Sequence, residues 1–447
     1  MKIAMIGTGY VGLVSGACFS EFGFQVQCVD KDETKVARLK SGEIPIYEPG
    51  LDQLVISNAQ QGRLHFTTDL KSAVSNADVV FIAVGTPGRR DEDGAVDMAY
   101  VDQATVEIAQ ALQGFTVVVT KSTVPVGTAR RLSAMIKQAN PNAEFAMAAN
   151  PEFLREGSAI EDFMRPDRVV IGVEDERARD LMTLSYRPLS LRNAPVIFTS
   201  FETAELIKYA TNAFLATRIS FVNELADLCE AVGANITEVN DALGRDGRIG
   251  PKYLHTGPAY GGPCFPKDTR ALAAIGREAG TVMRLVEATI EVNEERKKLM
   301  IEKILSHLDH DIDGKTIAIL GISFKPNTDD IREAPALTIV PALQEAGAHV
   351  KAHDPAAMAT AKNVLDNVSW CENPFDAAKD ADAVVILTEW NAYRGLDLHG
   401  LAQSMRSAVM IDLRNIYTLE EAQASPFAYH SLGRKSVEPK LSQQTEH

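Results

Sequence analysis

The amino-acid sequence predicts an α/β protein in which two parallel-sheet domains are joined by a central helical domain with a long connecting helix. Two observations lead to this prediction. Apolar, strand-like runs alternate with helical stretches near the N-terminus, and the same order returns near the C-terminus. Such alternation is typical of parallel sheets that are covered by helices. A length of 447 residues agrees with this division, because it exceeds what one hydrophobic core usually supports.

Four strand-like segments define the first predicted domain, which we place at residues 1–198. They are "KIAMIG" from Lys2, "QVQCVD" from Gln25, "ADVVFIAVGTP" from Ala77 and "TVVVTKSTVP" from Thr116. The first is a buried-strand run that ends in a glycine, and a helical stretch separates it from the second. This order is that of a parallel strand–helix–strand unit.

The pattern recurs in a second predicted domain at residues 312–430. Its strand-like segments are "TIAILGISF" from Thr316, "HVKAHDP" from His349, "ADAVVILTEW" from Ala381 and "VMIDLRN" from Val409. In both halves a glycine follows the first strand and an aspartate closes the second. We interpret the halves as related mononucleotide-binding, Rossmann-like domains, of which the second lacks the glycine fingerprint.

Between these domains lies a segment of helical character, which we place at residues 199–311. "FETAELIKYATNAFLATRISFVNELADLCEAVG" carries apolar residues at helical spacing, and "MRLVEATIEVNEERKKLMIEKILSHL" is a second helical run. Because a long helix between two domains often supplies an oligomer interface, we expect a homodimer, or a higher oligomer, through this domain. The last segment, residues 431–447, is polar and is expected to be a flexible tail.

The composition excludes some classes of partner. A net charge of −15 argues against nucleic acid, which would need a basic face, and an anionic ligand would need a local cluster of Lys and Arg. No apolar run is as long as a membrane span. The five cysteines are scattered without paired spacing, which fits reduced thiols. We therefore expect a cytoplasmic protein with no nucleic-acid or membrane partner.

The segment "GTGYVG" places Gly7, Gly9 and Gly12 after a strand and before a helix. The first allows a tight turn, the second lets the backbone approach a pyrophosphate, and the third lets the helix pack closely on the strand. Asp30 closes the next strand, where a carboxylate would bond a ribose 2′-hydroxyl and repel a 2′-phosphate. This favours NAD, although the nearby Lys35 could instead serve an NADP phosphate. A glycine-rich turn that binds nothing is the structural alternative.

The segment "GPAYGGPCFPKD" at 257–268 puts Cys264 in a turn rich in glycine and proline, just before a predicted helix. A free cysteine is usually a small buried hydrophobe. At a helix N-terminus, with Lys267 close in sequence, the nucleophilic thiolate form is favoured. Asp268 follows one turn later and could orient a base or a water. The alternative is a small residue that closes a turn.

Three further elements carry candidate catalytic groups, each with a structural alternative. Lys208 and Asn212 are four residues apart on a predicted helix, where they could hold a developing oxyanion or simply be solvated. Glu152 and Glu156 in "NPEFLREG" could divide general-base and positioning work, or be acids at a helix N-terminus. Thr123 ends a strand of the first sheet, at the edge where ligands of such sheets bind.

No segment predicts a metal site. The two histidines of "HLDHD" at 307–311 are three residues apart, which alone could suggest a pair of ligands. The segment follows a charged helix and precedes "IDGK", so we interpret it as a solvated linker.

Seven segments follow one another in a familiar order: "GTGYVG", "GTP", "KSTVP", "NPEFLREG", "ELIKYATNAF", "GGPCFPKD" and "SFKPNTDDIRE". They span residues 3–333, and "IDLRN" extends the match to Asn415. Together they resemble the nucleotide-sugar dehydrogenase family, which oxidises the C6 alcohol of a sugar to a carboxylate. "GRDGRIGPKYLHTGPAYGG" resembles the UDP-glucose branch more than the GDP-mannose branch. The resemblance implies oxidation of UDP-glucose by two NAD and water to UDP-glucuronate.

The resemblance also implies catalytic roles. Cys264 would attack the C6 aldehyde, then carry a thiohemiacetal and, after the second hydride loss, a thioester. Lys208 and Asn212 would hold the oxyanion, and Asp268 would assist a base water or Lys208.

For hydrolysis of the thioester, the resemblance implies that Thr123 and Glu152 position and activate a water. Glu156 would support Glu152 or Lys208. The covalent bond to sulfur would also retain the intermediate while NADH is exchanged for NAD.

Two binding sets follow from the same resemblance. The cofactor set is Gly7, Gly9, Tyr10, Val11, Gly12, Asp30, Lys35, Thr86, Pro87, Thr123, Glu156, Lys267 and Arg332. The substrate set is Glu152, Phe153, Leu154, Lys208, Asn212, Arg248, Tyr253, Gly257, Gly261, Cys264, Phe324, Lys325 and Arg414. Arg248 matches an arginine that reaches across from a neighbouring subunit, and Arg332 matches one near the NAD pyrophosphate. "GPAYGG" departs from the usual pattern, because Pro258 and Ala259 stiffen the glycine loop.

Two alternatives to this function stay open. GDP-mannose or a UDP-N-acetylhexosamine could be oxidised by the same residues, because the segments "SFKP" and "YLHTG" do not indicate which nucleobase is bound. A non-catalytic NAD-binding sensor could keep the two-domain fold, but it would be expected to have lost the nucleophile or the groups that support it.

Overall fold

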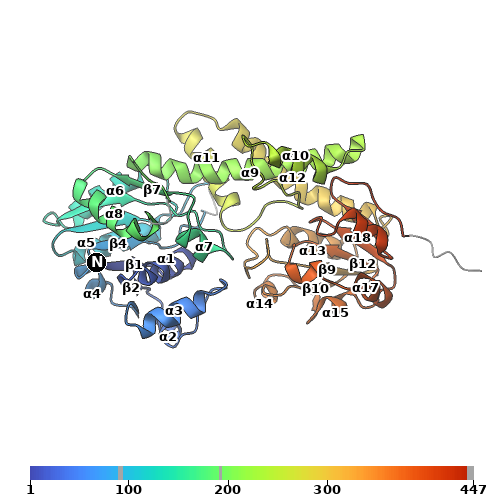
Figure 1. The fold of residues 1–447 in the computed structure, drawn as a ribbon, viewed down its shortest axis with the longest axis horizontal. Coiled ribbons are helices and arrows are strands. Elements are labelled where there is room, and N and C mark those ends of the chain that lie inside the picture. The colour runs from blue at the N-terminus through green and yellow to red at the C-terminus, as the bar shows by residue number, and fades with distance from the viewer. Residues whose placement is uncertain (89–93, 191–193, 440–447) are drawn as a thin grey trace, which may run out of the picture. The chain divides into compact units, whose positions relative to one another are not determined.

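The computed structural model describes residues 1–88, 94–190 and 194–439 of the chain. The chain forms two compact units. The first contains Met1–Thr211 together with Ala271–Val282, and the second contains Asn212–Arg270 together with the chain from Met283 onward. Each unit is built around one sheet (Figure 1).

The first unit holds an eight-stranded sheet in the order β3-β2-β1-β4-β5-β6-β7-β8, in which only the β6–β7 pair is antiparallel. The strands are β1 (Lys2–Ile6), β2 (Gln25–Val29), β3 (Leu64–Thr67), β4 (Val79–Ile82), β5 (Thr116–Thr120), β6 (Phe145–Ala149), β7 (Val169–Val173) and β8 (Val196–Thr199). The four predicted strands are present as β1, β2, β4 and β5. The sequence analysis did not include the other four; β3 is very short, and the alanines of β6 carry little strand signal.

Helices cover both faces of this sheet. Alternate residues of β1 show the arrangement, because Ile3 and Met5 belong to one buried core and Ala4 and Ile6 to the other. The helices are α1 (Tyr10–Glu21), α2 (Glu33–Lys40), α3 (Leu51–Gln60), α4 (Leu70–Ser75), α5 (Ala99–Ala111), α6 (Thr128–Ala139), α7 (Ala159–Met164) and α8 (Glu176–Ser190). The order β3-β2-β1-β4-β5-β6 is that of a doubly wound dinucleotide-binding sheet.

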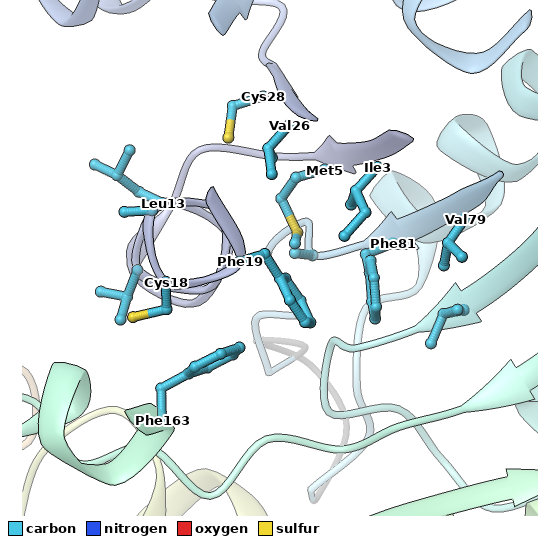
Figure 2. Close-up of a cluster of buried hydrophobic side chains, with 14 of the residues drawn as sticks. Ile3, Met5, Leu13, Cys18, Phe19, Val26, Cys28, Val79, Phe81 and Phe163 are labelled. Carbon is cyan, nitrogen blue, oxygen red and sulfur yellow. The ribbon is translucent and has the colours of Figure 1, made fainter. Parts of the chain in front are cut away.

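One of these two cores is built around aromatic rings (Figure 2). Phe19 projects from α1 and stacks on Phe81 of β4, with 5.1 Å between the ring centroids. Phe163 of α7 meets Phe19 edge to face at 5.0 Å. Burial of one such ring stabilises the fold by roughly 2–3 kcal/mol. The cluster therefore holds α1 on the sheet, with its N-terminus at the carboxyl end of β1.

The second unit holds a six-stranded, all-parallel sheet in the order β11-β10-β9-β12-β13-β14. The strands are β9 (Thr316–Leu320), β10 (His349–His353), β11 (Val368–Trp370), β12 (Ala383–Ile386), β13 (Val409–Asp412) and β14 (Ala428–Ser431). The four predicted strands are β9, β10, β12 and β13. The helices are α10 (Ile236–Arg245), α12 (Arg284–Ser306), α13 (Ala336–Glu345), α14 (Met358–Ala361), α15 (Pro374–Ala378), α16 (Asn391–Arg394), α17 (Leu398–Ser404) and α18 (Leu419–Ala424).

The two sheets repeat one pattern, as the sequence predicts. In the first, the N–H of Gly7 donates to the carbonyl of Val29 at 2.8 Å; in the second, the N–H of Gly321 donates to the carbonyl of His353 at 2.9 Å. Both glycines have positive φ, 101° and 94°, which other residues adopt at a cost. The predicted fold class, two Rossmann-like parallel-sheet domains with a central helical region, is confirmed.

Helices α9 (Phe201–Val232) and α11 (Phe265–Glu278) each contribute residues to both units (Figure 1). The 32 residues of α9 form the predicted long helix. Together, α9, α10, α11 and α12 account for most of the segment between residues 201 and 306. The division into three domains with boundaries near residues 198 and 311 stays a prediction.

The segment that begins at residue 431 corrects our expectation of a flexible tail. The N–H of Gly433 donates to the carboxylate of Glu230 at 2.7 Å. The guanidinium of Arg434 is buried and donates to oxygen atoms of the second unit. Because these polar groups are buried and hydrogen-bonded, the segment is part of the folded unit rather than of a tail. Residues 440–447 of the predicted tail lie outside the described residues.

The segment 307–311 is a turn rather than a solvated linker. His307 stacks on His430, with 3.8 Å between the ring centroids, and Leu308 is buried. Burial, together with the neighbouring His430, lowers the pKa of His307 to about 4. The ring is therefore neutral at physiological pH and packs as an aromatic group.

The three glycines of "GTGYVG" have different surroundings. A Cβ atom at Gly12 would lie 2.0 Å from the carbonyl oxygen of Gly7, and one at Gly7 would lie 2.7 Å from the carbonyl oxygen of Ala83. A Cβ atom at Gly9 would have no neighbour within 4 Å. The first and third glycines thus serve close packing of α1 on the sheet, whereas the second leaves open space at the start of the helix.

Gly12→Ala is expected to destabilise the chain, because its methyl group overlaps a backbone carbonyl that cannot move without shifting β1. Overpacking of this kind costs roughly 3 kcal/mol. Gly9→Ala, which places its methyl group in open space at φ −71°, serves as the matched control and should unfold within about 2 °C of the unmodified chain. Thermal unfolding by circular dichroism measures both; equal melting temperatures for the two variants would refute this account of the turn.

Candidate active site

The start of α1 is a candidate phosphate-binding site at the carboxyl end of β1. Gly9 is the N-cap of α1, and its helix end carries no side-chain cap. The first N–H groups of a helix have no partner within it, and the helix dipole favours an anion there. Because the space around Gly9 is open, a pyrophosphate can approach the backbone. These residues fit a dinucleotide.

Asp30 closes β2 beside this helix start. Its Oδ2 accepts hydrogen bonds from the N–H of Thr8 (3.0 Å), the hydroxyl of Thr8 (2.6 Å) and the ammonium of Lys35 (2.9 Å). Burial raises the pKa of this carboxyl, but the hydrogen bonds outweigh burial and hold the pKa at about 2. The carboxylate is therefore ionised at physiological pH and repels a 2′-phosphate, while Lys35, the candidate NADP ligand, is paired with it. The geometry favours NAD.

Tyr10 and Val11, predicted at the cofactor, both pack against the core below the helix start. The Tyr10 hydroxyl donates a short hydrogen bond to Glu48, which also accepts the N–H groups of Gly157 (2.6 Å) and Ala159 (2.7 Å). The Glu48 carboxylate thus links the first turn of α1 to the loop before α7 by hydrogen bonds. The sequence analysis did not single out Glu48, since a lone acid before a proline gives no such signal.

The carboxyl ends of three neighbouring strands carry the next predicted residues. Thr86 and Pro87 follow β4, Thr123 follows β5 and Glu152 follows β6. Because these strands are parallel, their carboxyl ends meet at one edge of the sheet, where α/β proteins bind ligands. The structure thus brings these residues to the edge at which α1 begins.

A buried ion pair joins α9 to this edge. The ammonium of Lys208 lies 2.9 Å from Oε1 of Glu152, and the two side chains are only 4% and 6% exposed. Oε2 of Glu152 accepts the N–H of Leu154 at 2.5 Å. Two buried charges are tolerated here because they neutralise each other and the carboxylate has a further donor. Thr123 and Lys208 line the same small cavity, so the structure brings together three of the predicted catalytic residues.

Residues 151–158 form a loop, which corrects the interpretation of their acids as helix residues. Helix α7 begins only at Ala159. N–H groups of this loop bind carboxylate side chains instead of preceding carbonyls, as between Leu154 and Glu152, so no helical turn forms. Glu152 and Glu156 therefore do not share a helix face. Glu156 directly precedes Gly157, whose N–H donates to Glu48.

The Phe153 ring, predicted to contact substrate, lies near two cations. The guanidinium of Arg168 lies 3.6 Å from the ring centroid and the ammonium of Lys208 lies 5.6 Å from it. Cation–π contacts of this kind hold an aromatic ring in place. Leu154, the other predicted contact of this loop, packs against the aromatic core.

Two buried charged residues of this region were absent from the predicted set. Lys121 directly follows β5, and burial lowers the pKa of its ammonium to about 8. Glu205 lies three residues before Lys208 on α9 and accepts hydrogen bonds from the start of α6. Both occur inside segments that the sequence analysis quoted, "KSTVP" and "ELIKYATNAF". The helical spacing of Glu205 and Lys208 was the one signal for Glu205.

In the second unit, Asp268 is the centre of another buried cluster. Its Oδ2 accepts the side-chain amide of Asn212 at 2.6 Å, and its Oδ1 accepts the ammonium of Lys267 at 2.6 Å. Asn212 follows Lys208 by one turn of α9, as the sequence predicts. Lys267, expected at the cofactor, thus pairs with the predicted catalytic carboxylate.

Cys264 immediately precedes α11, and its carbonyl accepts the N–H of Asp268 at 2.8 Å. It is partly exposed, whereas Cys28 is fully buried and burial raises the pKa of the Cys28 thiol to about 12. Partial exposure at a helix N-terminus is the setting of reactive cysteines. The predicted start of this helix is confirmed.

Buried side chains of α9 and α12 hold the glycine loop that precedes Cys264. The N–H of Gly257 donates to Asn223 at 3.0 Å, and the Gly257 carbonyl accepts from Arg296 at 2.7 Å. Asn293 accepts the N–H of Tyr260 at 2.8 Å and donates to its carbonyl at 3.0 Å. The loop backbone is therefore held in one conformation by side chains that lie apart from it in the sequence.

This loop lies against the carboxyl edge of the second sheet. Phe324 and Lys325 follow β9, and Arg414 follows β13. A Cβ atom at Gly257 would lie 2.8 Å from the Arg414 guanidinium, and one at Gly262 would lie 2.6 Å from the Phe324 ring. The structure brings these predicted substrate residues together, and only glycines allow the close approach.

The remaining predicted residues of this unit have local partners. Gly261 packs against the backbone carbonyl of Glu333, and a Cβ atom at Gly261 would lie 2.4 Å from that oxygen. Tyr253 has a positive φ of 63°, and Arg332 forms an ion pair with a neighbouring aspartate. Arg248 pairs with Asp246, and its side chain is 89% exposed. Within the described part of this unit, Arg248 has no hydrogen bond or ion pair with the residues around the glycine loop, and its partner is Asp246.

Asp354 occupies the position in the second sheet that Asp30 has in the first. It is fully buried and accepts hydrogen bonds from four backbone N–H groups, the Ser323 hydroxyl and the Trp390 indole. A Cβ atom at Gly321 would lie 2.4 Å from Thr388. The carboxylate is thus closed to a ribose, which explains the absence of a dinucleotide fingerprint in this half.

The described ranges contain neither a metal site nor a membrane-spanning helix. No group of three or more His, Cys, Asp and Glu side chains within residues 1–88, 94–190 and 194–439 is arranged to hold a metal ion. Over the same ranges, no helix combines the length and the apolar character needed to cross a membrane.

Comparison with known families agrees with this geometry. Residues 1–190 match the NAD binding domain of the UDP-glucose/GDP-mannose dehydrogenase family, residues 202–295 match its central domain, and residues 318–419 match its UDP binding domain. The chain belongs to this family. The predicted resemblance to nucleotide-sugar dehydrogenases is confirmed, as is NAD as the cofactor of the first domain.

Relatives within this family match nearly the whole chain. The UDP-glucose 6-dehydrogenase of Rhizobium meliloti (strain 1021) is 56% identical over 97% of this chain and 100% of its own length. The UDP-glucose 6-dehydrogenase TuaD of Bacillus subtilis (strain 168) is 48% identical over 98% of this chain and 94% of its own length. The structure of a UDP-glucose dehydrogenase from Pyrobaculum islandicum has a TM-score of 0.89 and 37% identity, and covers 97% of this chain and 98% of the relative. The chain is therefore an oxidoreductase of this family.

Asp30→Ser is expected to shift the preference from NAD toward NADP, because it removes the charge that repels a 2′-phosphate and releases Lys35. A charge-assisted hydrogen bond is worth roughly 1.5–3 kcal/mol, so the ratio of kcat/KM for NAD to that for NADP should fall by about a hundredfold. Glu33→Ser, which removes the same charge from the exposed start of α2, is the control. An unchanged ratio in Asp30→Ser would remove this carboxylate from cofactor selection.

Proposed function

We propose that this chain oxidises UDP-glucose to UDP-glucuronate, consuming two NAD and one water and releasing two NADH and protons. The observation that carries the proposal is the 56% identity with the UDP-glucose 6-dehydrogenase of Rhizobium meliloti over 97% of the chain. The hydrogen bonds within each unit support it, because buried partners hold Lys208 on Glu152 in the first unit and Asn212 on Asp268 in the second.

The first unit provides the cofactor site. NAD, when bound, supplies the hydride acceptor for both oxidations. The amide groups after Gly9 would bind the pyrophosphate and Asp30 would bind the ribose, while Thr86, Pro87 and the neighbouring strand ends would line the site. Asp30 is already ionised, so it can accept hydroxyl hydrogens without first losing a proton.

The first oxidation removes a proton from the C6 hydroxyl as hydride leaves C6. Lys208 is paired with Glu152 as an ammonium, so its role is to stabilise the developing alkoxide. Asn212, one turn along α9, would donate its amide to the same oxygen. Asp268, which holds Asn212, would orient the water that takes the proton.

Cys264 makes the second oxidation possible. Its sulfur would add to the C6 aldehyde to form a thiohemiacetal, which again carries a hydride on C6 and an oxygen held by Lys208 and Asn212. Loss of the second hydride leaves a thioester on sulfur. The position at the start of α11 supports the thiolate that this addition requires.

Hydrolysis of the thioester completes the reaction. The oxygen of a water bonds to the carbonyl carbon, the C–S bond breaks, and Cys264 leaves as a thiolate. Thr123 would position this water and Glu152 would accept its proton. Glu156 would support Glu152 from the same loop.

Cations near the glycine loop would bind the diphosphate of UDP-glucose. A protein with a net charge of −15 needs local positive charge to attract an anionic substrate. Lys325 and Arg414 supply it at the carboxyl edge of the second sheet, within the residues that match the UDP binding domain of the family. Tyr253 and the backbone of the loop through Gly261 would contact the sugar.

With UDP-glucose as the limiting reactant, the completed reaction is expected to yield about two NADH per UDP-glucose, because the sulfur-bound intermediate allows the second hydride loss. Absorbance at the NADH band measures the ratio, and mass spectrometry identifies the acid. A ratio of one would mean that oxidation stops at the aldehyde. Rates with GDP-mannose and UDP-N-acetylhexosamines test the two alternative substrates, and a preference for either would overturn the choice of UDP-glucose.

Cys264→Ser serves as the control for this experiment. It should bind NAD and UDP-glucose as the unmodified chain does but stall before the acid forms, because a hydroxyl is a far weaker nucleophile than a thiolate. Full acid formation by this variant would exclude the thioester mechanism while leaving the substrate assignment intact.

We also propose a homodimer that forms through the central helices. Helix α9 exposes Phe214, Phe221 and Leu228, which are 64%, 53% and 55% exposed and recur every seven residues, so they form one apolar stripe. Apolar stripes of this size are uncommon on monomeric proteins. Arg248, exposed at the end of α10, would reach into the substrate site of the partner.

A cytoplasmic location is the third part of this proposal. All five cysteines are free thiols rather than disulfides. Free, scattered cysteines are typical of proteins in a reducing compartment.

Phe221→Asp is expected to yield a monomer, since it places a charge in the middle of the apolar stripe. Sedimentation velocity at micromolar concentration measures the change. Leu184→Asp, at an apolar position on α8 that is 40% exposed, is the control and should remain dimeric. A dimeric Phe221→Asp variant would show that this stripe is not the interface.

A further inference from the structure

A carboxylate outside the proposed catalytic set lies next to it. Glu205 precedes Lys208 by three residues on α9, so the two side chains project from the same face of the helix. The Glu205 side chain is buried, and its two oxygens accept the N–H groups of Gly127 at 2.6 Å and Ala129 at 2.8 Å. It is therefore anchored at a second helix.

These N–H groups belong to the start of α6. Gly127 is the N-cap of that helix and has no side chain of its own to cap it. Glu205 thus caps α6 from another helix, where a carboxylate also interacts favourably with the helix dipole. Burial raises the pKa of Glu205 and the hydrogen bonds from Ala129 and Gly127 lower it; burial outweighs them and the pKa is about 7. The ionised carboxylate and the two capping hydrogen bonds depend on each other.

The segment between β5 and α6 carries Thr123. Glu205 fastens the far end of this segment to α9, and the Glu152 ion pair fastens Lys208 to the next strand end. Between them lies a cavity of about 10 Å³, at the lower limit of the space that can hold one water. The cavity is lined by Thr120, Ser122, Thr123, Val124, Ala149, Pro151, Glu205 and Lys208.

We propose that Glu205 is a positioning residue for thioester hydrolysis, which fixes Thr123 relative to Lys208 and keeps the space between them the size of one water. The inference rests on the proposed function, in which Thr123 positions the water whose oxygen replaces sulfur on the carbonyl carbon. Glu205 acts through the Thr123 segment and through α9, and it takes no proton in this step.

Glu202 offers a matched control on the preceding turn of α9. It pairs with Arg130 of α6 at the surface, so it also links the two helices, but it does not line the cavity. A purely structural link between α9 and α6 would be weakened by either substitution. Only Glu205 joins that link to the Thr123 segment.

The test compares Glu205→Gln with Glu202→Gln at about pH 8, above the pKa at which Glu205 loses its proton. Glutamine keeps the size of the side chain but turns an amide N–H toward a backbone N–H donor. We expect kcat of Glu205→Gln to fall roughly tenfold with kcat/KM for UDP-glucose nearly unchanged, because the slowed step follows formation of the covalent intermediate. Intact-mass spectrometry should detect a substrate adduct on Cys264 during turnover, while Glu202→Gln should behave as the unmodified chain.

A double-mutant cycle with Thr123→Val separates positioning from stability. If Glu205 acts through Thr123, Glu205→Gln should have little further effect on kcat in the Thr123→Val background. Glu205→Asp, which keeps the charge, enters the same cycle should the glutamine variant fail to fold. Additive effects, an unchanged kcat, or an equal loss in Glu202→Gln would overturn the proposal. If the unmodified chain forms no NADH with UDP-glucose, the proposed function itself fails and the positioning role fails with it.

Discussion

The buried ion pair between Lys208 and Glu152 is the constraint on which the rest of the candidate site depends. Neither charge could stay in its low-dielectric surroundings alone, because burying an unpaired charge costs several kcal/mol. The pair therefore fastens α9 to the carboxyl end of β6 at one position along the helix. Asn212 follows Lys208 by one turn of the same helix, on the same helix face.

The two sheets show how one pattern can serve two purposes. In each, an aspartate at the end of the second strand binds the backbone that follows the first strand. Asp30 keeps part of its surface open and pairs with Lys35, so it can exchange partners with a ribose. Asp354 is covered by Trp390 and has become a structural anchor. The difference lies in the neighbours of the carboxylate, since Asp354 also accepts the N–H groups of Ala356 and Ala357 on its other oxygen.

Sequence reasoning reached the fold because buried parallel strands, glycine turns and helical spacing are local signals. The same local signals predicted the nucleotide end and the helix that begins after Cys264, whereas the catalytic roles of Cys264 and Lys208 stay predictions. Sequence reasoning left two alternatives open for the acids of 151–158, since whether a carboxylate caps a loop or extends a helix depends on N–H groups that folding brings near it. It missed Glu205 and Glu48, whose partners lie far away in the sequence, and it treated residues after 430 as a tail because their polar side chains find partners only in the folded unit.

Each oxygen of the Glu152 carboxylate already accepts one hydrogen bond, one from the Lys208 ammonium and the other from the Leu154 N–H. A carboxylate oxygen has two lone pairs, so a water can still reach it, but the water competes with these donors. If Lys208 turns to a negative oxygen on the substrate, one oxygen of Glu152 is released at the same moment. The negative charge of the transition state would then draw the Lys208 ammonium away from Glu152. One movement of the Lys208 side chain would thus stabilise the oxyanion and free a position on the base.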